Sequence, residues 1–527
     1  MAEPQEPGDW TQRARKELPL GVVRVVTRDD AETDPALSTG YVPSRLLIST
    51  LLPPDDAVRK ALAELVAEFG WTLEPVPPRE RVPRLEESAE VREERLSRYP
   101  WATGVPGTER FRLRAPAGST PTPDAWDLLR RARERGIELP GVGLEHVGEI
   151  APFHSSNPFH SSNPFHSSNP FHSSNPFHSS NPYLGATPSA EYGMPGSGGR
   201  QVVAFTGPDP AGAGEKPHGE PVVVGIVDTG CGRHPWLDAA VMPAFADTGR
   251  TQPDDDPESL PDQLGPLDGM IDVGSGHGTF VAGLVHQAAP HARLAPVRIT
   301  GSDALWEEQD LVDALTGIVA RVEGGERLDV LNLSLGYYHE TPQRNAFDIS
   351  VAELLLRLRR AGVVVVCSAG NDSTDRPLFP AAFGPWRPEP AGGAPWIDPG
   401  DAAPLVSVGA LNPNGTVALF SNIGPWVQTF APGAAVLSTV PAGTKPTRFD
   451  GGLQPTAASP VDGVNRETID PDDFSGGFAV WSGTSFAAPV VAGLIAAELQ
   501  RSAGAPSVES ARSAVKAVLA ALRRHPD

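Results

Sequence analysis

The chain has 527 residues, more than one ordinary hydrophobic core accommodates, so its length predicts two folded parts. Its formal net charge is -22, from 43 basic and 65 acidic residues, and such an acidic surface argues against binding to nucleic-acid phosphates. The 2 cysteines, Cys231 and Cys367, exclude a disulfide framework and favour two free thiols.

The N-terminus and the hydropathy pattern bear on location. Residues 1–20 carry charges of both signs and lack the apolar run of a signal peptide. No stretch of about 18 apolar residues predicts a membrane span. We therefore expect a cytoplasmic protein that does not enter a membrane. Secretion is the alternative, because a missing upstream start codon could hide a signal peptide.

Residues 1–150 predict a small α+β domain. Two strand-helix-strand units follow one another, the first at residues 46–48, 55–69 and 71–76, the second from residue 111 through a helix at 123–135 to a strand at 142–150. We interpret the charged residues 79–98 between them as a solvated excursion. Two such units in series predict a ferredoxin-like sandwich.

A perfect repeat follows this domain. The hexapeptide Phe-His-Ser-Ser-Asn-Pro begins at Phe153 and recurs at residues 159, 165, 171 and 177. A proline in every repeat forbids a helix, so residues 151–215 predict a semi-stiff linker, with a docking or regulatory element as the alternative. The repeat histidines are not expected to share a metal ion, because six residues span about 19 Å in polyproline II geometry. These histidines are His154, His160, His166, His172 and His178.

Residues 216–527 have a different pattern, in which apolar runs alternate with helical segments. This alternation predicts a parallel sheet covered by helices on both faces. The runs lie at residues 222–227, 294–299, 330–335, 363–368 and 406–411. Helices are expected to begin near His277, Asp310, Ser350 and Ser485.

Two polar residues lie where these elements begin or end. Asp228 follows a buried strand and precedes a glycine turn, at the kind of strand end where sites in such sheets are built. His277 opens a helix among glycines that permit close approach of other backbone. Each alone is ambiguous, because an aspartate also caps loops and a histidine also serves as an ordinary N-terminal helix residue.

Ser485 and Asn371 complete the set. Ser485 opens a helix and has small neighbours, which leave room for an acyl group, although serine is also a common helix cap. Asn371 follows a buried strand, where its amide suits an oxyanion and where a turn asparagine is the alternative. The chain order Asp, His, Asn, Ser is one of the known orders of a convergent Ser-His-Asp triad.

On these motifs, the segment from residue 221 to residue 499 resembles the subtilase family of subtilisin-like serine proteases. The matching motifs are Asp228-Thr229-Gly230, His277-Gly278-Thr279, Asn332-Leu333-Ser334-Leu335-Gly336, Ala369-Gly370-Asn371 and Gly483-Thr484-Ser485-Phe486-Ala487-Ala488-Pro489. The resemblance implies an α/β fold with a subtilisin-like doubly wound parallel sheet, and a serine endopeptidase that acts on proteins or peptides.

The resemblance also implies a role for each matching residue. Ser485 is expected to attack the scissile carbonyl, His277 to transfer the proton and Asp228 to hold the imidazole ring. Asn371 and the Ser485 amide are expected to form the oxyanion hole. Ser334, Leu335 and Gly336 resemble the strand that pairs with extended substrate, and Ser368, Ala369 and Gly370 resemble the wall of a roomy apolar pocket.

Two positions depart from the family pattern without touching proton transfer. Phe280 and Phe486 stand where the family often has histidine and methionine. No cofactor is required and no metal ligands are assigned, although family members often bind structural calcium. The acidic insertions at residues 251–272 and 441–473 are candidates for it, with solvated loops as the alternative.

The resemblance suggests that residues 1–150 form a prodomain that holds the enzyme in check, with a retained module that binds a regulatory protein as the alternative. Two rival functions remain. A sedolisin-type acid peptidase normally uses a Glu-Asp pair and an aspartate as oxyanion donor, whereas this chain offers His277 and Asn371. A non-hydrolytic binding module is expected to have a broken triad, and no triad residue is missing.

Overall fold

The computed structural model describes most of the chain outside its long insertions. The described residues are 24–26, 39–53, 56–78, 82–118, 122–150, 200–205, 207–212, 219–252, 255–261, 263, 271–272, 274–340, 349–385, 400–442, 474, 476–502 and 506–522. The five hexapeptide repeats, and nearly all of the insertion at residues 441–473, lie outside them.

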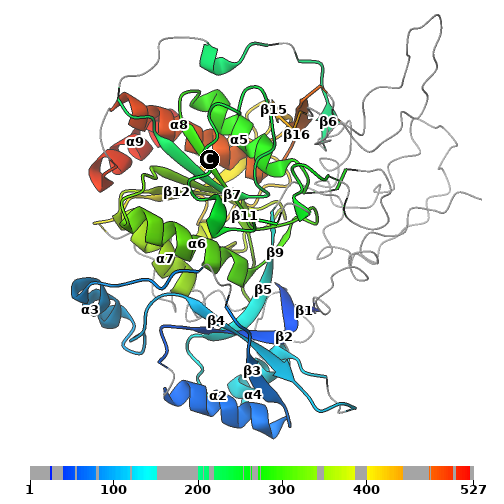
Figure 1. Cartoon of the computed structure of the whole chain (residues 1–527), viewed down its shortest axis with the longest axis vertical. Coiled ribbons are helices and arrows are strands. Elements are labelled where there is room, and N and C mark those ends of the chain that lie inside the picture. The colour runs from blue at the N-terminus through cyan, green and yellow to red at the C-terminus, as the bar shows by residue number, and fades with distance from the viewer. Residues whose placement is uncertain are drawn as a thin grey trace, which may run out of the picture.

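The N-terminal unit, described within residues 24–150, is an α+β sandwich (Figure 1). Its elements are β1 (Arg24–Val26), β2 (Thr39–Ser49), α2 (Ala57–Glu68), β3 (Thr72–Pro75), α3 (Ala89–Arg98), β4 (Thr108–Arg114), α4 (Ala125–Glu134) and β5 (Val142–Ile150). Four strands pair antiparallel in the order β5-β2-β4-β3, and β1 pairs with β2. The order β-α-β-β-α-β is that of the split βαβ motif.

The helices of this unit form where capping and amphipathicity coincide. Asp56 caps α2 by accepting from the Val58 amide, and Asp124 caps α4 by accepting from the Trp126 amide. The buried side of α4 includes Leu128 and Leu129, which join the core against the sheet. Both helices therefore cover one face of the sheet and leave the other to the C-terminal unit (Figure 1).

The charged stretch between the two strand-helix-strand units is only partly a solvated excursion. Ser88 caps helix α3, and Arg95 of this helix is fully buried. The Arg95 guanidinium donates to the carbonyl oxygens of Ala102 and Gly104 and pairs with Glu87. The stretch therefore combines mostly exposed residues, as a solvated excursion predicts, with one buried arginine that has backbone acceptors and a carboxylate partner.

The C-terminal unit, described within residues 200–522, is built on a parallel sheet of strands in the order β14-β13-β12-β10-β7-β8. Its strands are β6 (Gln201–Val202), β7 (Val223–Asp228), β8 (Arg293–Arg298), β9 (Leu305–Glu307), β10 (Val330–Leu333), β11 (Leu335–Gly336), β12 (Val364–Ser368), β13 (Leu405–Leu411), β14 (Thr429–Pro432), β15 (Val436–Thr439) and β16 (Phe478–Trp481). Its α-helices are α5 (His277–Ala288), α6 (Glu308–Glu323), α7 (Ile349–Arg360), α8 (Thr484–Arg501) and α9 (Val508–Ala521).

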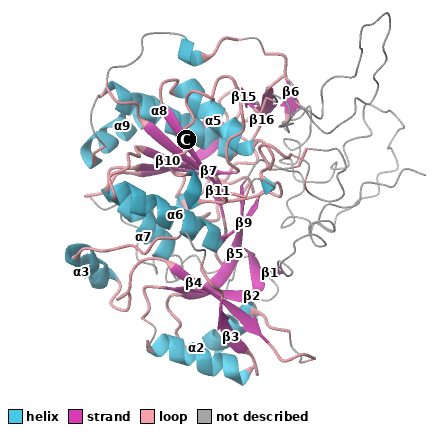
Figure 2. Cartoon of the chain, in the orientation of Figure 1, coloured by secondary structure: helices cyan, strands magenta, loops and turns pink. Residues whose placement is uncertain are grey.

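The parallel sheet is covered on both faces, as the apolar runs predict. Helices α5, α8 and α9 lie on one face, and α6 and α7 lie on the other (Figure 2). Each face has its own buried cluster, because alternate residues of a strand point in opposite directions. Ile226 of β7 belongs to the first cluster and Val227 to the second. The α/β fold with a doubly wound parallel sheet is thus confirmed.

Strand β5 joins the two units. Besides pairing with β2, its C-terminal half pairs antiparallel with β9 and β11 of the C-terminal unit. Gly148 lies opposite Trp306, and Ile150 lies opposite Leu335. The end of the N-terminal unit therefore lies as a strand between two strand edges of the C-terminal unit.

Two smaller observations complete the fold. Both cysteines are free, as expected, and burial raises the pKa of each thiol well above its ordinary value. Within the described ranges, no helix has both the length and the apolarity that crossing a membrane requires.

Candidate active site

Asp228 and His277 form the centre of the candidate site. Asp228 is the last residue of β7 and His277 is the first residue of α5, and both side chains are fully buried. The His277 Nδ1 atom lies 2.8 Å from the Asp228 Oδ1 atom. This contact turns Nε2 away from the carboxylate, and among the described residues Nε2 has no hydrogen-bond partner. With its proton on Nδ1, the ring presents Nε2 as a base.

Glycine at position 278 allows α5 to reach the aspartate strand. A Cβ atom built on Gly278 would collide with the carbonyl oxygen of Gly230. The Gly278 amide instead approaches the Thr229 hydroxyl, to which it donates at 2.7 Å. Glycine next to His277 therefore lets the backbone of α5 come close to the segment after β7, as the sequence predicts.

Ser485 lies at the second position of α8, directly before Phe486. Its Oγ atom donates to the Ser334 carbonyl oxygen at 3.3 Å, and the Ser334 hydroxyl donates back to the Ser485 carbonyl at 2.7 Å. The ring of Phe486 packs against the His277 ring with centroids 5.2 Å apart. The helix turn that carries Ser485 is therefore in direct contact with the histidine.

Asn371 is tied to the same helix start. The amide and the hydroxyl of Thr484 both donate to the Asn371 Oδ1 atom, at 2.8 and 2.9 Å. The Thr484 hydroxyl also accepts from the Gly370 amide at 3.0 Å. Because Oδ1 accepts both hydrogen bonds from Thr484, the Nδ2 group is the donor of the Asn371 side chain. Thr484 directly precedes Ser485 in the sequence.

The strand expected to bind substrate is already paired. Ser334, Leu335 and Gly336 are all buried, and Leu335 and Gly336 lie opposite Ile150 and Glu149 of β5. The edge where an extended substrate was predicted to pair is therefore occupied by the N-terminal unit's own backbone.

The expected pocket wall is also packed. Ser368, Ala369 and Gly370 follow one another at the end of β12 and are buried, but Leu378 lies against both Gly336 and Gly370. A side chain at either glycine would collide with the Leu378 isobutyl group. Leu378 therefore lies close to this wall, and the roomy apolar slot stays a prediction.

Sequence reasoning missed Glu258, which lies directly behind the Asp228–His277 pair. Its side chain is buried, and its carboxyl group accepts from the Thr229 hydroxyl, from the Gly278 amide at 3.1 Å and from the Thr279 hydroxyl at 2.5 Å. Burial raises the pKa of Glu258 to about 7, although the two threonine hydroxyls oppose the shift. Glu258 thus fastens the aspartate segment to the histidine helix.

The acidic insertion around Glu258 does not gather its described carboxylates around one point. Asp255 pairs with Arg298 at 2.6 Å, and Asp256 accepts from the Glu258 amide and the Ser259 hydroxyl. The neighbouring Asp254 lies outside the described residues. Asp255 and Asp256 thus both have partners within the protein. Calcium binding by this insertion stays a prediction.

Comparison with known proteins agrees with this geometry. A sequence model of the subtilase family matches residues 219–521. The chain is 28% identical over 275 residues to the thermophilic serine proteinase of Bacillus sp. (strain AK1), an alignment that covers 52% of this chain and 51% of that protein. It is 29% identical to fervidolysin of Fervidobacterium pennivorans, over 54% of this chain and 36% of that protein.

Two further similarities complete the comparison. The chain is 27% identical to the intracellular serine protease of Paenibacillus polymyxa, over 53% of this chain and 66% of that protein. The crystal structure of fervidolysin superposes with a TM-score of 0.43 and 19% identity, covering 88% of this chain and 56% of that chain. The chain spans about half the length of the Bacillus relative and about a third of fervidolysin.

Proposed function

The chain belongs to the subtilase family, and from this premise we propose that it is a serine endopeptidase that cleaves proteins or peptides through an acyl-enzyme. One observation carries the proposal, the 2.8 Å hydrogen bond from His277 to Asp228 beside the helix turn of Ser485. The histidine of a catalytic triad needs a buried aspartate that fixes its imidazole ring, whereas an ordinary buried histidine does not.

Each residue has a role in the proposed reaction. Ser485 Oγ attacks the scissile carbonyl while His277 Nε2 takes its proton, and the same nitrogen then donates that proton to the leaving amine. Asp228 stabilises the imidazolium that forms between these steps. The Asn371 amide and the Ser485 N–H donate to the oxyanion. These steps use only side chains and backbone of this chain and need no cofactor.

The Ser485 hydroxyl has to leave the Ser334 carbonyl to take part. Its 3.3 Å hydrogen bond to that oxygen is long, so the bond is weak and its loss costs little. Catalytic hydrogen bonds often tighten only when substrate is present. Substrate binding along β11 is expected to reorganise this contact, since Ser334 immediately precedes β11.

We further propose that the N-terminal unit holds the peptidase in check. Support comes from β5, whose residues Gly148 to Ile150 pair antiparallel with β9 and β11, as an extended substrate would. The Ile150 amide also donates to the Ala304 carbonyl at 2.8 Å. A substrate that needs the β11 edge must first displace this strand.

The location of the protein is a proposal as well. The relative from Paenibacillus polymyxa is named an intracellular serine protease, which supports the expected cytoplasmic location. A relative from Xanthomonas campestris is named an extracellular protease, so secretion is kept as the alternative.

The activity is tested with the full chain and its Ser485→Ala variant. A fluorophosphonate probe is expected to label the wild type and not the variant. Casein hydrolysis requires β5 to leave the β11 edge, so it is expected to be slow in the full-length wild type and absent from the variant. Mass spectrometry of both proteins then tests the role of the N-terminal unit. A new N-terminus between residues 182 and 221 in the wild type alone would support self-processing. Equal casein hydrolysis by wild type and variant, with no labelling of either, would leave a binding module as the better reading.

A further inference from the structure

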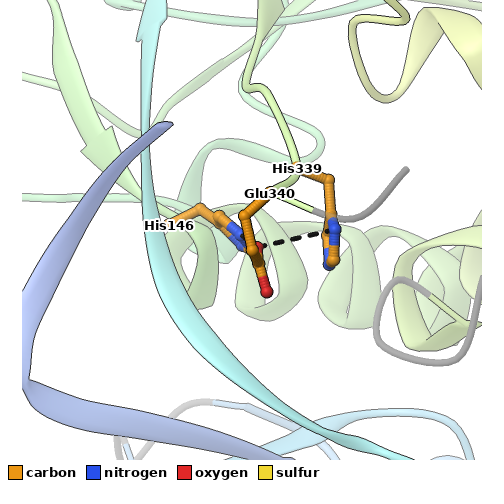
Figure 3. A group of neighbouring side chains, drawn as sticks. All are labelled: His146, His339 and Glu340. Atoms are coloured by element: carbon orange, nitrogen blue, oxygen red, sulfur yellow. Dashed lines mark hydrogen bonds and ion pairs between the residues drawn. The ribbon is translucent and has the colours of Figure 1, made fainter. Parts of the chain in front are cut away.

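A second cluster of reactive side chains lies at the boundary between the two units, away from the catalytic pair. It contains His146 from β5 and the consecutive residues His339 and Glu340, which follow β11 (Figure 3). All three side chains are buried and point toward one another. Nothing in the proposed peptide hydrolysis uses them.

Two of the three separations between ligand atoms are close to those around a small metal ion. One atom from each side chain can be chosen so that all three lie within 4.8 Å of one another. His146 Nε2 lies 2.9 Å from Glu340 Oε2, and His339 Nδ1 lies 3.5 Å from the same oxygen. Tetrahedral zinc, with bonds of about 2.0 to 2.1 Å, separates its ligand atoms by about 3.3 Å. The distances from Glu340 Oε2 to the two histidine nitrogens, 2.9 and 3.5 Å, lie just below and just above this separation.

Glu308, the first residue of α6, supplies the support that a metal-binding histidine usually has. Its Oε2 atom lies 2.6 Å from His146 Nδ1. A carboxylate on one ring nitrogen fixes the orientation of the ring, so that the other nitrogen, Nε2, faces His339 and Glu340. This carboxylate–histidine arrangement is the usual second layer of zinc sites.

The Oε2 atom of Glu340 is the oxygen that faces both histidines. Arg133 contacts the other oxygen, Oε1, at 3.2 Å and leaves Oε2 for the histidines.

Without an ion, the His146 ring lies between two carboxylates, with Glu308 at Nδ1 and Glu340 at Nε2. A divalent ion would take the place of the hydrogen bond between His146 Nε2 and Glu340 Oε2. The plain alternative is a buried ion pair that never binds metal.

We propose that His146, His339 and Glu340 form a binding site for a divalent transition-metal ion, Zn²⁺ by the chemistry of two imidazoles and one carboxylate. Calcium is disfavoured, because it requires six to eight oxygen ligands. The ligands come from both units, so a bound ion fastens β5 to the residues that follow β11. This consequence rests on the proposed inhibitory role of the N-terminal unit, whereas metal binding itself does not.

The test uses the full-length Ser485→Ala chain, stripped with a chelator and titrated with Zn²⁺ or with Co²⁺, whose visible absorption reports tetrahedral coordination. The repeat contains five histidines that can bind metal weakly, so these are changed to glutamine in every protein. This background is expected to bind one equivalent with a tetrahedral Co²⁺ spectrum. His146→Gln and His339→Gln are expected to lose it, and His291→Gln, on a half-buried turn remote in sequence, is the matched control.

A supporting variant guards against simple misfolding. Glu308→Gln keeps all three ligands and is expected to weaken metal affinity about 10- to 100-fold, as loss of such a support does elsewhere. Melting temperatures of the metal-free proteins identify any variant that is not folded. The proposal is overturned if the background binds no tight equivalent, or if His146→Gln and His291→Gln bind equally. The Ser485→Ala chain has no proposed activity, so either result is independent of the peptidase proposal.

Discussion

Glu258 contacts both segments that carry the catalytic pair. Its carboxyl group accepts from Thr229, which follows Asp228, and from Gly278 and Thr279, which follow His277. These contacts set the spacing between β7 and α5 from a third part of the chain. We therefore assign Glu258 a positioning role, because it touches neither the proposed nucleophile nor the substrate.

The raised pKa of Glu258 predicts a pH-dependent stability. Its folded pKa of about 7 exceeds the ordinary 4.5, so the folded state binds more protons between these values. The stabilisation is complete below pH 4.5 and is lost as the pH rises through 7. Glu258→Gln mimics the protonated form. In the Ser485→Ala background, it is expected to be more stable than its parent at pH 8, by up to about 3 kcal/mol, and similar at pH 5.

Thermal unfolding at a fixed scan rate across pH 5 to 8 measures this difference. Asp238→Asn is a control, since its carboxyl group forms a surface pair with Arg233 and its pKa is lowered rather than raised. A gap between Glu258→Gln and its parent that stays constant with pH would contradict the assignment.

Asn371 is expected to affect turnover more than binding. Its Oδ1 atom accepts from Thr484, so Asn371→Asp keeps the acceptor and replaces the amide donor with a second carboxylate oxygen, which brings a negative charge. We expect kcat to fall on the order of 10²- to 10³-fold with little change in KM, because the donor acts on the oxyanion of the transition state. Steady-state kinetics on a peptide substrate check this. A rise in KM at unchanged kcat would instead indicate a substrate-binding role.

At the scale of elements, β5 depends on a single glycine where it crosses the C-terminal unit. A Cβ atom on Gly148 would overlap the Trp306 ring, which is itself buried. Gly148→Val is therefore expected to push β5 away from β9 and β11. In the Ser485→Ala background, the amides of residues 335 and 336 should exchange with solvent at least about fivefold faster, since 1 kcal/mol changes an equilibrium by that factor.

Hydrogen exchange followed by mass spectrometry makes this measurement. Gly212→Val is the matched control, because nothing lies within 4 Å of a Cβ atom at Gly212. Unchanged exchange in Gly148→Val, with the fold intact, would mean that the strand pairing contributes little to holding the units together.

The helices and strands that have a local sequence signal could be predicted from the sequence. Strand β7 and helix α5 appear where the apolar run and the glycine-flanked histidine place them, and the Asp228–His277 contact follows from the parallel sheet. Leu378 and Glu258 could not be predicted, because each enters the site from a loop whose path depends on the whole fold. The pairing of β5 with β11 joins residues far apart in sequence and has no local signature either.

At the scale of the whole molecule, ion pairs add to the strand pairing between the units. Glu307 at the end of β9 accepts from Arg45 at 2.8 Å and from Arg110 at 2.7 Å. The Ser49 and Ser350 hydroxyls lie 2.7 Å apart, and the Thr108 hydroxyl donates to Gln309 at 2.8 Å. The contacts extend well beyond β5, so the N-terminal unit should remain bound after the chain between the units is cut.

A nicked protein tests this directly. A recognition site for a site-specific protease is inserted within residues 183–199 of the Ser485→Ala chain, and the cut protein is passed over a size-exclusion column. We expect the two fragments to elute together. Glu307→Ala leaves the buried Arg45 and the half-buried Arg110 without one of their carboxylates, so it should weaken the fragment complex about tenfold or more. Glu109→Ala, which removes a half-exposed pairing with Arg59 inside the N-terminal unit, should change the affinity far less. Because the Glu307 pairs are partly solvated, added salt should narrow the difference in fragment affinity between these two variants. Fragments of the parent that separate at once would instead show that the strand pairing and its ion pairs depend on the covalent link.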